Sequence, residues 1–444
     1  MPAKAAIHAF VQLGQDVDGR DKPGHDDRKR TRADFKRQLR YCSPMLRVLA
    51  IIVALLSWAA PLRADPIADT LAGSAQVGAF LDALWADAQK RGITRATFDQ
   101  ALAGFAPDAR VIAATRREPE YGKPVGLYIG SIASKSNIAT GAAKASQWAG
   151  VLDAIEAKYG VERGIVLALW GIESSFGAGA DRWDVIRSLA TLAEARYRDP
   201  YFRNELLVAL KILQEGHIAR ERMLGSWAGA MGQPQFMPSS FYQYAVDFTG
   251  DGRRDIWTSV PDVLASIANY MARSGWQRGL PWGFEAALPQ GFDYRMSRGT
   301  FAEWTRRGVR RADGGALPDA GEAFLLFPSG AVGPAFLVSA NFNAIKLYNN
   351  SDVYALAVGH LADRMYGGAP FRAAWPKDDP QLSRDARIAL QRKLASLGYA
   401  VKDFAGRLDF EQRDYIRDLQ VKNGMVADGH PTPALLARLV INLQ

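Results

Sequence analysis

The sequence contains one cysteine, Cys42, in 444 residues, and this scarcity excludes several kinds of chemistry. Disulfide frameworks and cysteine metal sites need at least two cysteines. Cys42 precedes an apolar run that we predict to be a cleaved export signal, so the mature protein would contain no thiol. No cysteine follows that run, so we expect no lipobox and no lipid anchor.

The common catalytic motifs are also missing. The chain has no GxSxG, P-loop, HExxH or CxxC sequence, which disfavours serine hydrolases and metallohydrolases. His217 and His360 lie on separate predicted helices without metal-ligand spacing, so we expect structural roles for both.

The net positive charge outside the N-terminal region is small. The formal charge is +9, but residues 1–64 carry six of these charges. No basic run with interleaved aromatic residues follows residue 65, so we expect no nucleic-acid partner.

Residues 45–64 have the features of a secretory signal peptide. Met45 and Arg47 precede an apolar stretch at 48–62, and Arg63 and Ala64 follow it. About 15 apolar residues are too few to span a bilayer, so we expect cleavage near Ala64 and a periplasmic protein. An uncleaved anchor is the alternative. Residues 1–44 are polar and aperiodic, and we expect them to be untranslated, with the true start at Met45, or a disordered leader.

The most informative stretch is ALWGIESSFG at 168–177. An apolar helical run there ends in one carboxylate, Glu173. A carboxyl group at the end of a buried helix has little water around it, which favours the neutral form and raises its pKa. A general acid that works near neutral pH needs this property. A glutamate on the polar edge of an amphipathic helix is the alternative.

Apolar periodicity predicts a mainly α (α+β) protein. Helical patterns run from 75 to 118 and from 120 to 160, and again over 188–216 with a break at Asp199-Pro200. Short apolar runs within 284–340 indicate a small sheet. We predict a catalytic domain at 65–367, a linker at 368–380 and three short helices at 381–444.

The segment 247–253 places oxygen donors where an EF-hand calcium loop has them. Asp247, Thr249 and Asp251 occupy positions 1, 3 and 5, and Gly252 occupies position 6. Thr258 stands at position 12, where a glutamate is expected, and Asp262 is the next candidate carboxylate. A turn stabilised by aspartate side chains fits the pattern equally well.

Glycosidases with two carboxylates need a second acid near the first. The next acids after Glu173 are Asp181 and Asp184, and nothing in the sequence turns either towards it. A mechanism with one carboxylate suits the chain better: Glu173 protonates the glycosidic oxygen and then, as carboxylate, removes a proton from a hydroxyl of the same sugar.

Four stretches together resemble the lytic murein transglycosylases of the membrane-bound B type. They are ALWGIESSFG (168–177), GSWAGAMGQPQFMPSSFYQYAVDFTGDGRRDIW (225–257), SIANYM (266–271) and KLYNNSDVYALAV (346–358). Their order and spacing match the family over about residues 75–366. The resemblance implies a lysozyme-like catalytic domain with a small β insertion.

The resemblance also implies an activity and its residues. The enzyme would cleave the β-1,4 bond between N-acetylmuramic acid and N-acetylglucosamine in peptidoglycan and leave 1,6-anhydromuramoyl ends, with Glu173 as the catalytic acid and base. The positions that match the family's saccharide-binding residues are Ser226, Gln235, Tyr270, Tyr348, Asn349 and Tyr354. The positions that match its calcium loop are Asp247, Thr249, Asp251, Arg253 (through its carbonyl) and Asp262, so we expect a structural Ca²⁺. We expect the chemistry itself to need no cofactor.

The last unit, 381–444, resembles the three-helix peptidoglycan-binding module, through LQRKLASLGY (390–399) and LQVKNGMVADGHPTPALLARL (419–439). The partners implied are peptidoglycan glycan strands, together with cell-wall synthesis or division proteins, and we expect a monomer. Two alternatives stay open: a lysozyme-like muramidase, which hydrolyses the same bond, and a catalytically inactive wall-binding protein.

Overall fold

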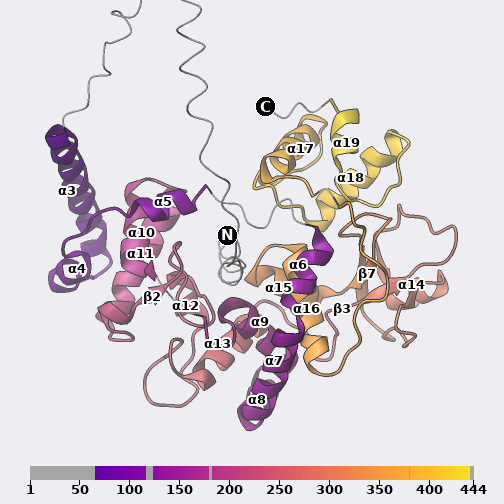
Figure 1. Cartoon of the computed structure of the whole chain (residues 1–444), viewed down its shortest axis with the longest axis horizontal. Coiled ribbons are helices and arrows are strands. Elements are labelled where there is room, and N and C mark those ends of the chain that lie inside the picture. Colours follow the sequence, from indigo (N-terminus) through magenta and orange to yellow (C-terminus); the bar gives the residue numbers. More distant parts are fainter. Residues whose placement is uncertain (1–65, 117–123, 180–182, 380, 441–444) are drawn as a thin grey trace, which may run out of the picture. The chain divides into compact units, whose positions relative to one another are not determined.

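The computed structural model describes residues 66–116, 124–179, 183–379 and 381–440 (Figure 1). The predicted leader at 1–44 and signal peptide at 45–64 lie outside these ranges. None of the helices in the described ranges has the length and apolar character needed to cross a membrane.

The described chain is mostly helical, as predicted. Its helices are α3 (Pro66–Lys90), α4 (Arg95–Leu102), α5 (Ala109–Ala114), α6 (Val125–Ile132), α7 (Lys135–Gln147), α8 (Ala149–Tyr159), α9 (Arg163–Ser174), α10 (Val185–Glu194), α11 (Tyr201–Gln214), α12 (Pro238–Tyr244), α13 (Val260–Arg273), α14 (Phe301–Arg306), α15 (Ala340–Tyr348), α16 (Asp352–Met365), α17 (Arg384–Ser396), α18 (Phe410–Lys422) and α19 (Pro433–Arg438). The chain divides into two compact units. The part of α3 before Ala88 belongs to one unit, and all later elements belong to the other.

Helix α9 lies at the centre of the helical part, where α7, α8, α13 and α16 pack around it. Its residues from Gly164 to Trp170 are all buried, which explains why its sequence is apolar on every face. The helix ends at Ser175, which adopts the left-handed conformation with a φ of 51°. Phe176 then turns back on the helix beside Gly171, where an added Cβ would lie 2.5 Å from the Phe176 ring.

The predicted break at Asp199-Pro200 is confirmed. Helices α10 and α11 flank it and pack against each other. Leu206, Leu207 and Leu210 of α11 are buried, and Leu213 is partly buried.

The predicted small sheet is also confirmed. Five antiparallel strands have the order β4-β6-β7-β3-β5. They are β3 (Gly283–Ala287), β4 (Arg298–Thr300), β5 (Arg310–Arg311), β6 (Glu322–Leu326) and β7 (Ala335–Val338), and a separate two-stranded pair joins β1 (Trp183–Asp184) to β2 (Leu224–Gly225).

One helix of this region, α14, was not predicted. Thr300 and Glu303 form a capping box at its start, and this pattern is visible in the sequence. Trp304 from α14 is fully buried against Ala323, Leu325 and Leu337 of the sheet.

Three helices form the C-terminal unit, as predicted for 381–444. Helices α17, α18 and α19, coloured yellow in Figure 1, share a core of Leu390, Leu394, Ile416, Leu419 and Leu435. Residues 368–379 before this unit form no helix or strand.

The C-terminal unit contacts the catalytic region through buried charges. Arg413 of α18 pairs with Asp352, the first residue of α16, at 2.6 Å. Lys346 of α15 pairs with the same carboxylate at 2.6 Å. Burial alone would raise the pKa of Asp352, but these two cations lower it to about 2. Arg417 also donates a hydrogen bond to the carbonyl of Leu325 in β6.

We expect Asp352→Ala to destabilise the folded protein by about 3–5 kcal/mol, because it leaves two buried cations without their anion. Chemical denaturation measures this change in the free energy of unfolding. The matched control is Asp385→Ala, which removes an exposed acid from α17 of the same unit and should change stability by less than about 0.5 kcal/mol.

The stabilisation from Asp352 should also depend on pH. Its pKa is lower in the folded protein than its ordinary value of 3.8, so the contribution is complete above that value and is lost as the pH falls towards 2. Equal stability losses for Asp352→Ala and Asp385→Ala would contradict this account of the interface.

Candidate active site

Glu173 lies in the last turn of α9 and is 4% exposed. The sequence predicted a carboxylate at the end of a buried helix, and the structure confirms that position. Ser174 donates from its hydroxyl to the carbonyl of Trp170 and accepts from the backbone N–H of Gly177. These bonds hold the sharp turn that follows the glutamate.

The carboxylate of Glu173 accepts a hydrogen bond from Tyr354. The Tyr354 hydroxyl lies 2.5 Å from Oε1. Tyr354 comes from the first turn of α16, where the side chain of Ser351 caps the helix by accepting the backbone N–H of Tyr354. The cap therefore fixes the turn of helix that presents the phenol to the carboxylate.

Three of the predicted tyrosines surround Glu173. Burial raises the pKa of Tyr348 and Tyr354 well above the ordinary value, and the negative charge of Glu173 raises both further. Burial likewise raises the pKa of Tyr270, with smaller contributions from Tyr244 and Glu173. All three phenols are therefore neutral near pH 7.

Tyr270 and Tyr348 belong to a larger aromatic cluster. Their ring centroids are 4.6 Å apart, and the Tyr244 ring lies 4.3 Å from that of Tyr270. Phe236 completes the cluster at 5.7 Å from Tyr270. The sequence prediction missed Tyr244 and Phe236, although both lie within the aromatic-rich segment 225–257 that the prediction singled out.

The loop that carries Ser226 and Gln235 is held by its own backbone. Ser226 Oγ accepts the N–H of Ala230 at 3.0 Å. The side-chain amide of Gln235 donates to the carbonyl of Gly232 at 2.9 Å, and the backbone of Gln235 is left-handed with a φ of 51°. The Tyr348 hydroxyl donates to the carbonyl of Pro234 at 2.5 Å. The structure thus brings this loop to the tyrosines beside Glu173.

The sequence prediction missed a contact between α9 and this loop. The indole N–H of Trp170 donates to Gln233 Oε1 at 2.7 Å, and the Gln233 amide donates to the carbonyl of Trp257 at 2.8 Å. Gln233 fixes the loop to the helix that carries Glu173.

Asn349 differs from the other predicted binding residues. Its side chain is 1% exposed, and neither its amide nitrogen nor its amide oxygen has a hydrogen-bond partner in the described structure. Leaving a buried amide unpaired costs about 1–3 kcal/mol for each group. Such a group, five residues before Tyr354 and next to Tyr348, is suited to a bound ligand.

The structure gives Asp184 a structural role. Its side chain caps α10 by accepting the N–H of Arg187 and pairs with Arg220 at 2.7 Å. Asp181 lies outside the described residues. The sequence prediction missed a different buried acid, Glu205, whose carboxylate accepts the N–H and the hydroxyl of Ser239. Neither Asp184 nor Glu205 has a described hydrogen bond to Glu173.

Four of the predicted calcium-binding residues lie in one loop, namely Asp247, Thr249, Asp251 and Arg253, whereas the fifth, Asp262, lies in the first turn of α13. Asp247 accepts the backbone N–H groups of Gly250 and Gly252, and these donors lower its pKa although desolvation opposes them. Asp262 is fully buried and accepts the N–H groups of Phe248 and Asp255.

The described ranges contain no cluster of three or more His, Cys, Asp or Glu side chains arranged for a metal ion. Backbone amides satisfy the carboxylates of this turn as it stands, and Ca²⁺ binding stays a prediction.

Comparison with known proteins shows two family matches. The profile of the family described as "Transglycosylase SLT domain" matches residues 76–363, and that of the "Putative peptidoglycan binding domain" matches residues 383–439. The first match covers most of the chain.

Individual relatives agree with these matches. The chain is 33% identical over 232 residues to membrane-bound lytic murein transglycosylase B of Escherichia coli K12, a match that covers 51% of this chain and 63% of that protein.

The chain is also similar to Pseudomonas aeruginosa SltB3, whose crystal structure was determined in complex with NAG-anhNAM-pentapeptide. The two sequences are 47% identical and the TM-score is 0.75, and the match covers 82% of this chain and 99% of SltB3. E. coli Slt35 in complex with calcium is 27% identical, with a TM-score of 0.54, over 66% of this chain and 92% of that one.

We expect Tyr354→Phe to raise the pKa of Glu173, because it removes a donor that stabilises the charged carboxylate. The loss of one hydrogen bond worth about 1 kcal/mol corresponds to a rise in the pKa of roughly 0.7. Carbon-detected NMR titration of the Glu173 carboxyl measures the change. Tyr197→Phe is the control, since Tyr197 stacks on Phe202 and has no described contact with Glu173. A pKa that stays the same or falls in Tyr354→Phe would show that the bond does not stabilise the anion.

Proposed function

The chain belongs to the transglycosylase SLT family and carries a peptidoglycan-binding domain at its C-terminal end, and from this we propose that it is a peptidoglycan lytic transglycosylase. The bond cleaved is the β-1,4 linkage between N-acetylmuramic acid and N-acetylglucosamine. The observation that carries the proposal is the buried Glu173 carboxyl with its hydrogen bond from Tyr354 at 2.5 Å.

Glu173 performs both proton transfers of the reaction. In its neutral form it donates a proton to the glycosidic oxygen, and the bond from that oxygen to C1 of the muramoyl residue breaks. The C6 hydroxyl of the same sugar then bonds to C1, and the Glu173 carboxylate takes its proton. The products are a free hydroxyl on one glycan piece and a 1,6-anhydro ring on the other, with no water consumed.

The environment of Glu173 suits this alternation. Burial favours the neutral acid before the first step, whereas the Tyr354 donor stabilises the carboxylate that the first step produces. The neutral phenols of Tyr270 and Tyr348 add apolar ring surface and no second charge. A dry site with one carboxyl group is what a reaction that excludes water requires.

Asn349 supplies the polar recognition. An amide offers both a donor and an acceptor, and in Asn349 both are buried and unpaired. We assign this side chain to an N-acetyl group or hydroxyl of the bound sugar. Tyr270 and Tyr348 belong to the same site, and Ser226 and Gln235 shape the loop beside it.

A muramidase of the same fold would use water in place of the C6 hydroxyl. Such an enzyme needs a base that activates the water, commonly a second carboxylate. Among the described acids, Asp184 is held by α10 and Arg220, and Glu205 by Ser239. This arrangement favours the transglycosylase over the hydrolase, and the match to the transglycosylase family favours it over an inactive wall-binding protein.

The C-terminal module would hold the enzyme on glycan strands while the catalytic domain acts. This role requires export, and we propose a periplasmic location after cleavage of the signal peptide at 45–64. Cell-wall synthesis or division proteins are the further partners that we propose, and a monomer is the proposed state.

A structural Ca²⁺ in the turn at Asp247 is a separate proposal. Its support is the donor pattern of Asp247, Thr249 and Asp251, together with the calcium complex of the relative Slt35. The negative charge of Asp247 also raises the pKa of Asp262, after the larger effect of burial, and a cation would relieve this repulsion.

Glu173→Gln should lower the rate of sacculus digestion by roughly 10²–10⁴-fold, because glutamine can neither donate nor take up the proton. Mass analysis of the wild-type products should find 1,6-anhydro ends. Asp184→Asn is the control, since asparagine can still cap α10, and it should keep the wild-type rate. Reducing muramic ends would establish a hydrolase, and undiminished digestion by Glu173→Gln would refute the assignment of Glu173.

Calcium should raise the melting temperature of chelator-treated protein by a few degrees, as expected for a ligand that binds only the folded state. Differential scanning calorimetry with and without added Ca²⁺ measures the shift. Asp251→Ala should abolish it, whereas Asp385→Ala should not. An equal melting temperature with and without the ion would count against the metal site.

A further inference from the structure

The buried acid Glu205 has no role in the proton transfers proposed above. It lies on α11 and is 4% exposed. Its carboxylate accepts the backbone N–H of Ser239 at 2.8 Å and the hydroxyl of the same residue at 2.6 Å. A buried carboxylate is costly unless donors of this kind satisfy it, and the two bonds fix Ser239 to α11.

Ser239 belongs to the first turn of α12, a helix that has no cap residue of its own. The side chain of Met237, the residue before the helix, accepts no hydrogen bond from the backbone. The N–H groups of a first helical turn need acceptors from outside the helix. Glu205 supplies one across 34 residues of sequence, so it takes the place of the missing cap.

The segment around α12 carries two aromatic rings into the cluster that contains Tyr270 and Tyr348. Tyr244 is the last residue of α12, and its ring centroid lies 4.3 Å from that of Tyr270. Phe236 precedes the helix, and its ring centroid lies 5.7 Å from that of Tyr270 and 6.0 Å from that of Tyr348. The position of α12 therefore determines how these two rings support the tyrosines assigned to sugar binding.

Different helices fix the two ends of α12. It lies between α11 and α13 and packs against both (Figure 1). At its C-terminal end, the side-chain amide of Asn269 on α13 donates to the carbonyl of Tyr244 at 2.9 Å. At its N-terminal end, Glu205 holds Ser239. Loss of the Glu205 bonds would free one end of the helix and leave the other in place.

Glu205 also interacts with Tyr201, one turn earlier on α11. Burial raises the pKa of Tyr201 well above its ordinary value of 10.0, and the charge of Glu205 and a hydrogen bond between the two side chains raise it further. The phenol of Tyr270 adds a smaller increase to this pKa. Tyr201 thus lies near both Glu205 and Tyr270, so the carboxylate adjoins the aromatic cluster as well as α12.

We propose that Glu205 is a positioning residue for sugar binding, which holds the aromatic cluster in its receptive arrangement through Ser239 and α12. This proposal rests on the proposed function, because that function assigns Tyr270 and Tyr348 to the sugar site. Glu205 acts through α12 and not on the reacting atoms. Since the Tyr354 donor to Glu173 comes from α16, loss of Glu205 should weaken sugar binding and leave the proton transfers nearly unchanged.

Isothermal titration calorimetry with the tetrasaccharide GlcNAc-MurNAc-GlcNAc-MurNAc tests this proposal. Every protein is the full chain with Glu173→Gln, which prevents cleavage during the titration. Adding Glu205→Gln should weaken binding roughly tenfold, because only one of the two carboxylate oxygens remains an acceptor. Adding Ser239→Ala should weaken it roughly threefold. The two changes together should cost less than the product of the single effects, because both remove the same hydrogen bond.

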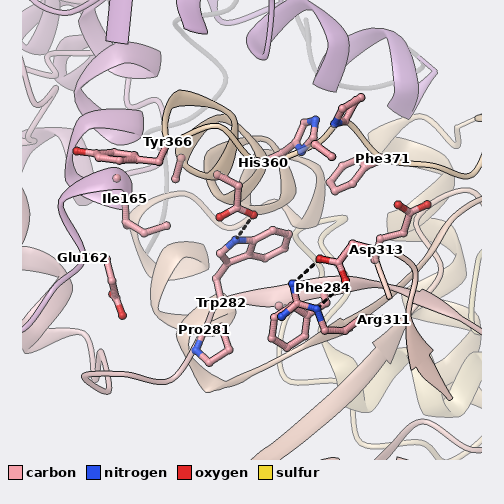
Figure 2. A pocket seen from close by; sticks show the side chains of 18 of the residues that line it. Glu162, Ile165, Pro281, Trp282, Phe284, Arg311, Asp313, His360, Tyr366 and Phe371 are labelled. Carbon is pink, nitrogen blue, oxygen red and sulfur yellow. Dashed lines mark hydrogen bonds and ion pairs between the residues drawn. The ribbon is translucent and has the colours of Figure 1, made fainter. Parts of the chain in front are cut away.

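Glu285→Gln is the matched control. Glu285 lines a separate cavity of about 660 Å³, which Figure 2 shows. Its carboxylate also accepts two hydrogen bonds, from the backbone N–H groups of Arg372 and Ala373 at 2.7 Å each. It therefore holds the predicted linker in the way that Glu205 holds α12, and Glu285→Gln should keep the affinity of the parent protein.

Steady-state cleavage of the same tetrasaccharide by proteins that keep Glu173 gives a second measurement. Glu205→Gln should raise KM roughly tenfold and change kcat less than about twofold. A lower kcat with an unchanged KM would overturn the positioning role.

Two results of the titrations would also overturn it and leave the proposed function standing. They are parent affinity in both Glu205→Gln and Ser239→Ala, and an equal loss of affinity in Glu285→Gln. Circular dichroism checks that each variant is folded, and Ser239→Ala decides the test should Glu205→Gln unfold. A parent protein that does not bind the tetrasaccharide, with a wild type that does not cleave it, would contradict the proposed function and this proposal with it.

Discussion

The hydrogen bond from Tyr354 to Glu173 is the interaction on which the rest of the active site depends. It joins the last turn of α9 to the first turn of α16, across 181 residues of sequence. A carboxyl group with 4% exposure has little water to stabilise its charge, so the protein itself must stabilise the carboxylate when the proton leaves. Tyr354 does this with a neutral donor, and burial favours the return of the proton. This environment suits the alternation between acid and base that we propose for Glu173.

The same turn of α16 connects the active site to the C-terminal module. Asp352 is two residues before Tyr354 and pairs with Lys346 and with Arg413 of α18. Asn349, with its unpaired amide, precedes this turn. Because the ion pair of Asp352 with Arg413 is buried, displacement of the module would leave both charges without a partner across the interface. The docking of the wall-binding module and the placement of Tyr354 thus depend on one short segment, 349–354.

Local features of the fold were predictable from the sequence, whereas most contacts between distant residues were not. Apolar periodicity predicted α9, the helices on either side of Asp199-Pro200 and the three C-terminal helices, because burial of one face depends on nearby residues. The cap residue Ser351 was also predictable, because capping depends on the type of residue that stands just before a helix. Periodicity does not indicate which distant group a buried polar side chain meets. The bond between Trp170 and Gln233, the buried Glu205 and the pair of Asp352 with Arg413 were therefore missed, and the tyrosines and Asn349 were predicted only through resemblance to a family.

We propose that one buried carboxyl group cleaves the glycan without an attacking water molecule. Digestion of sacculi in water enriched in ¹⁸O tests it most directly, with mass spectrometry of the released fragments. The account predicts that the new muramoyl ends contain no ¹⁸O, because the oxygen bonded to C1 comes from C6 of the same sugar. Incorporation of one ¹⁸O atom at each new end would show that water is the nucleophile, and would contradict the mechanism assigned to Glu173.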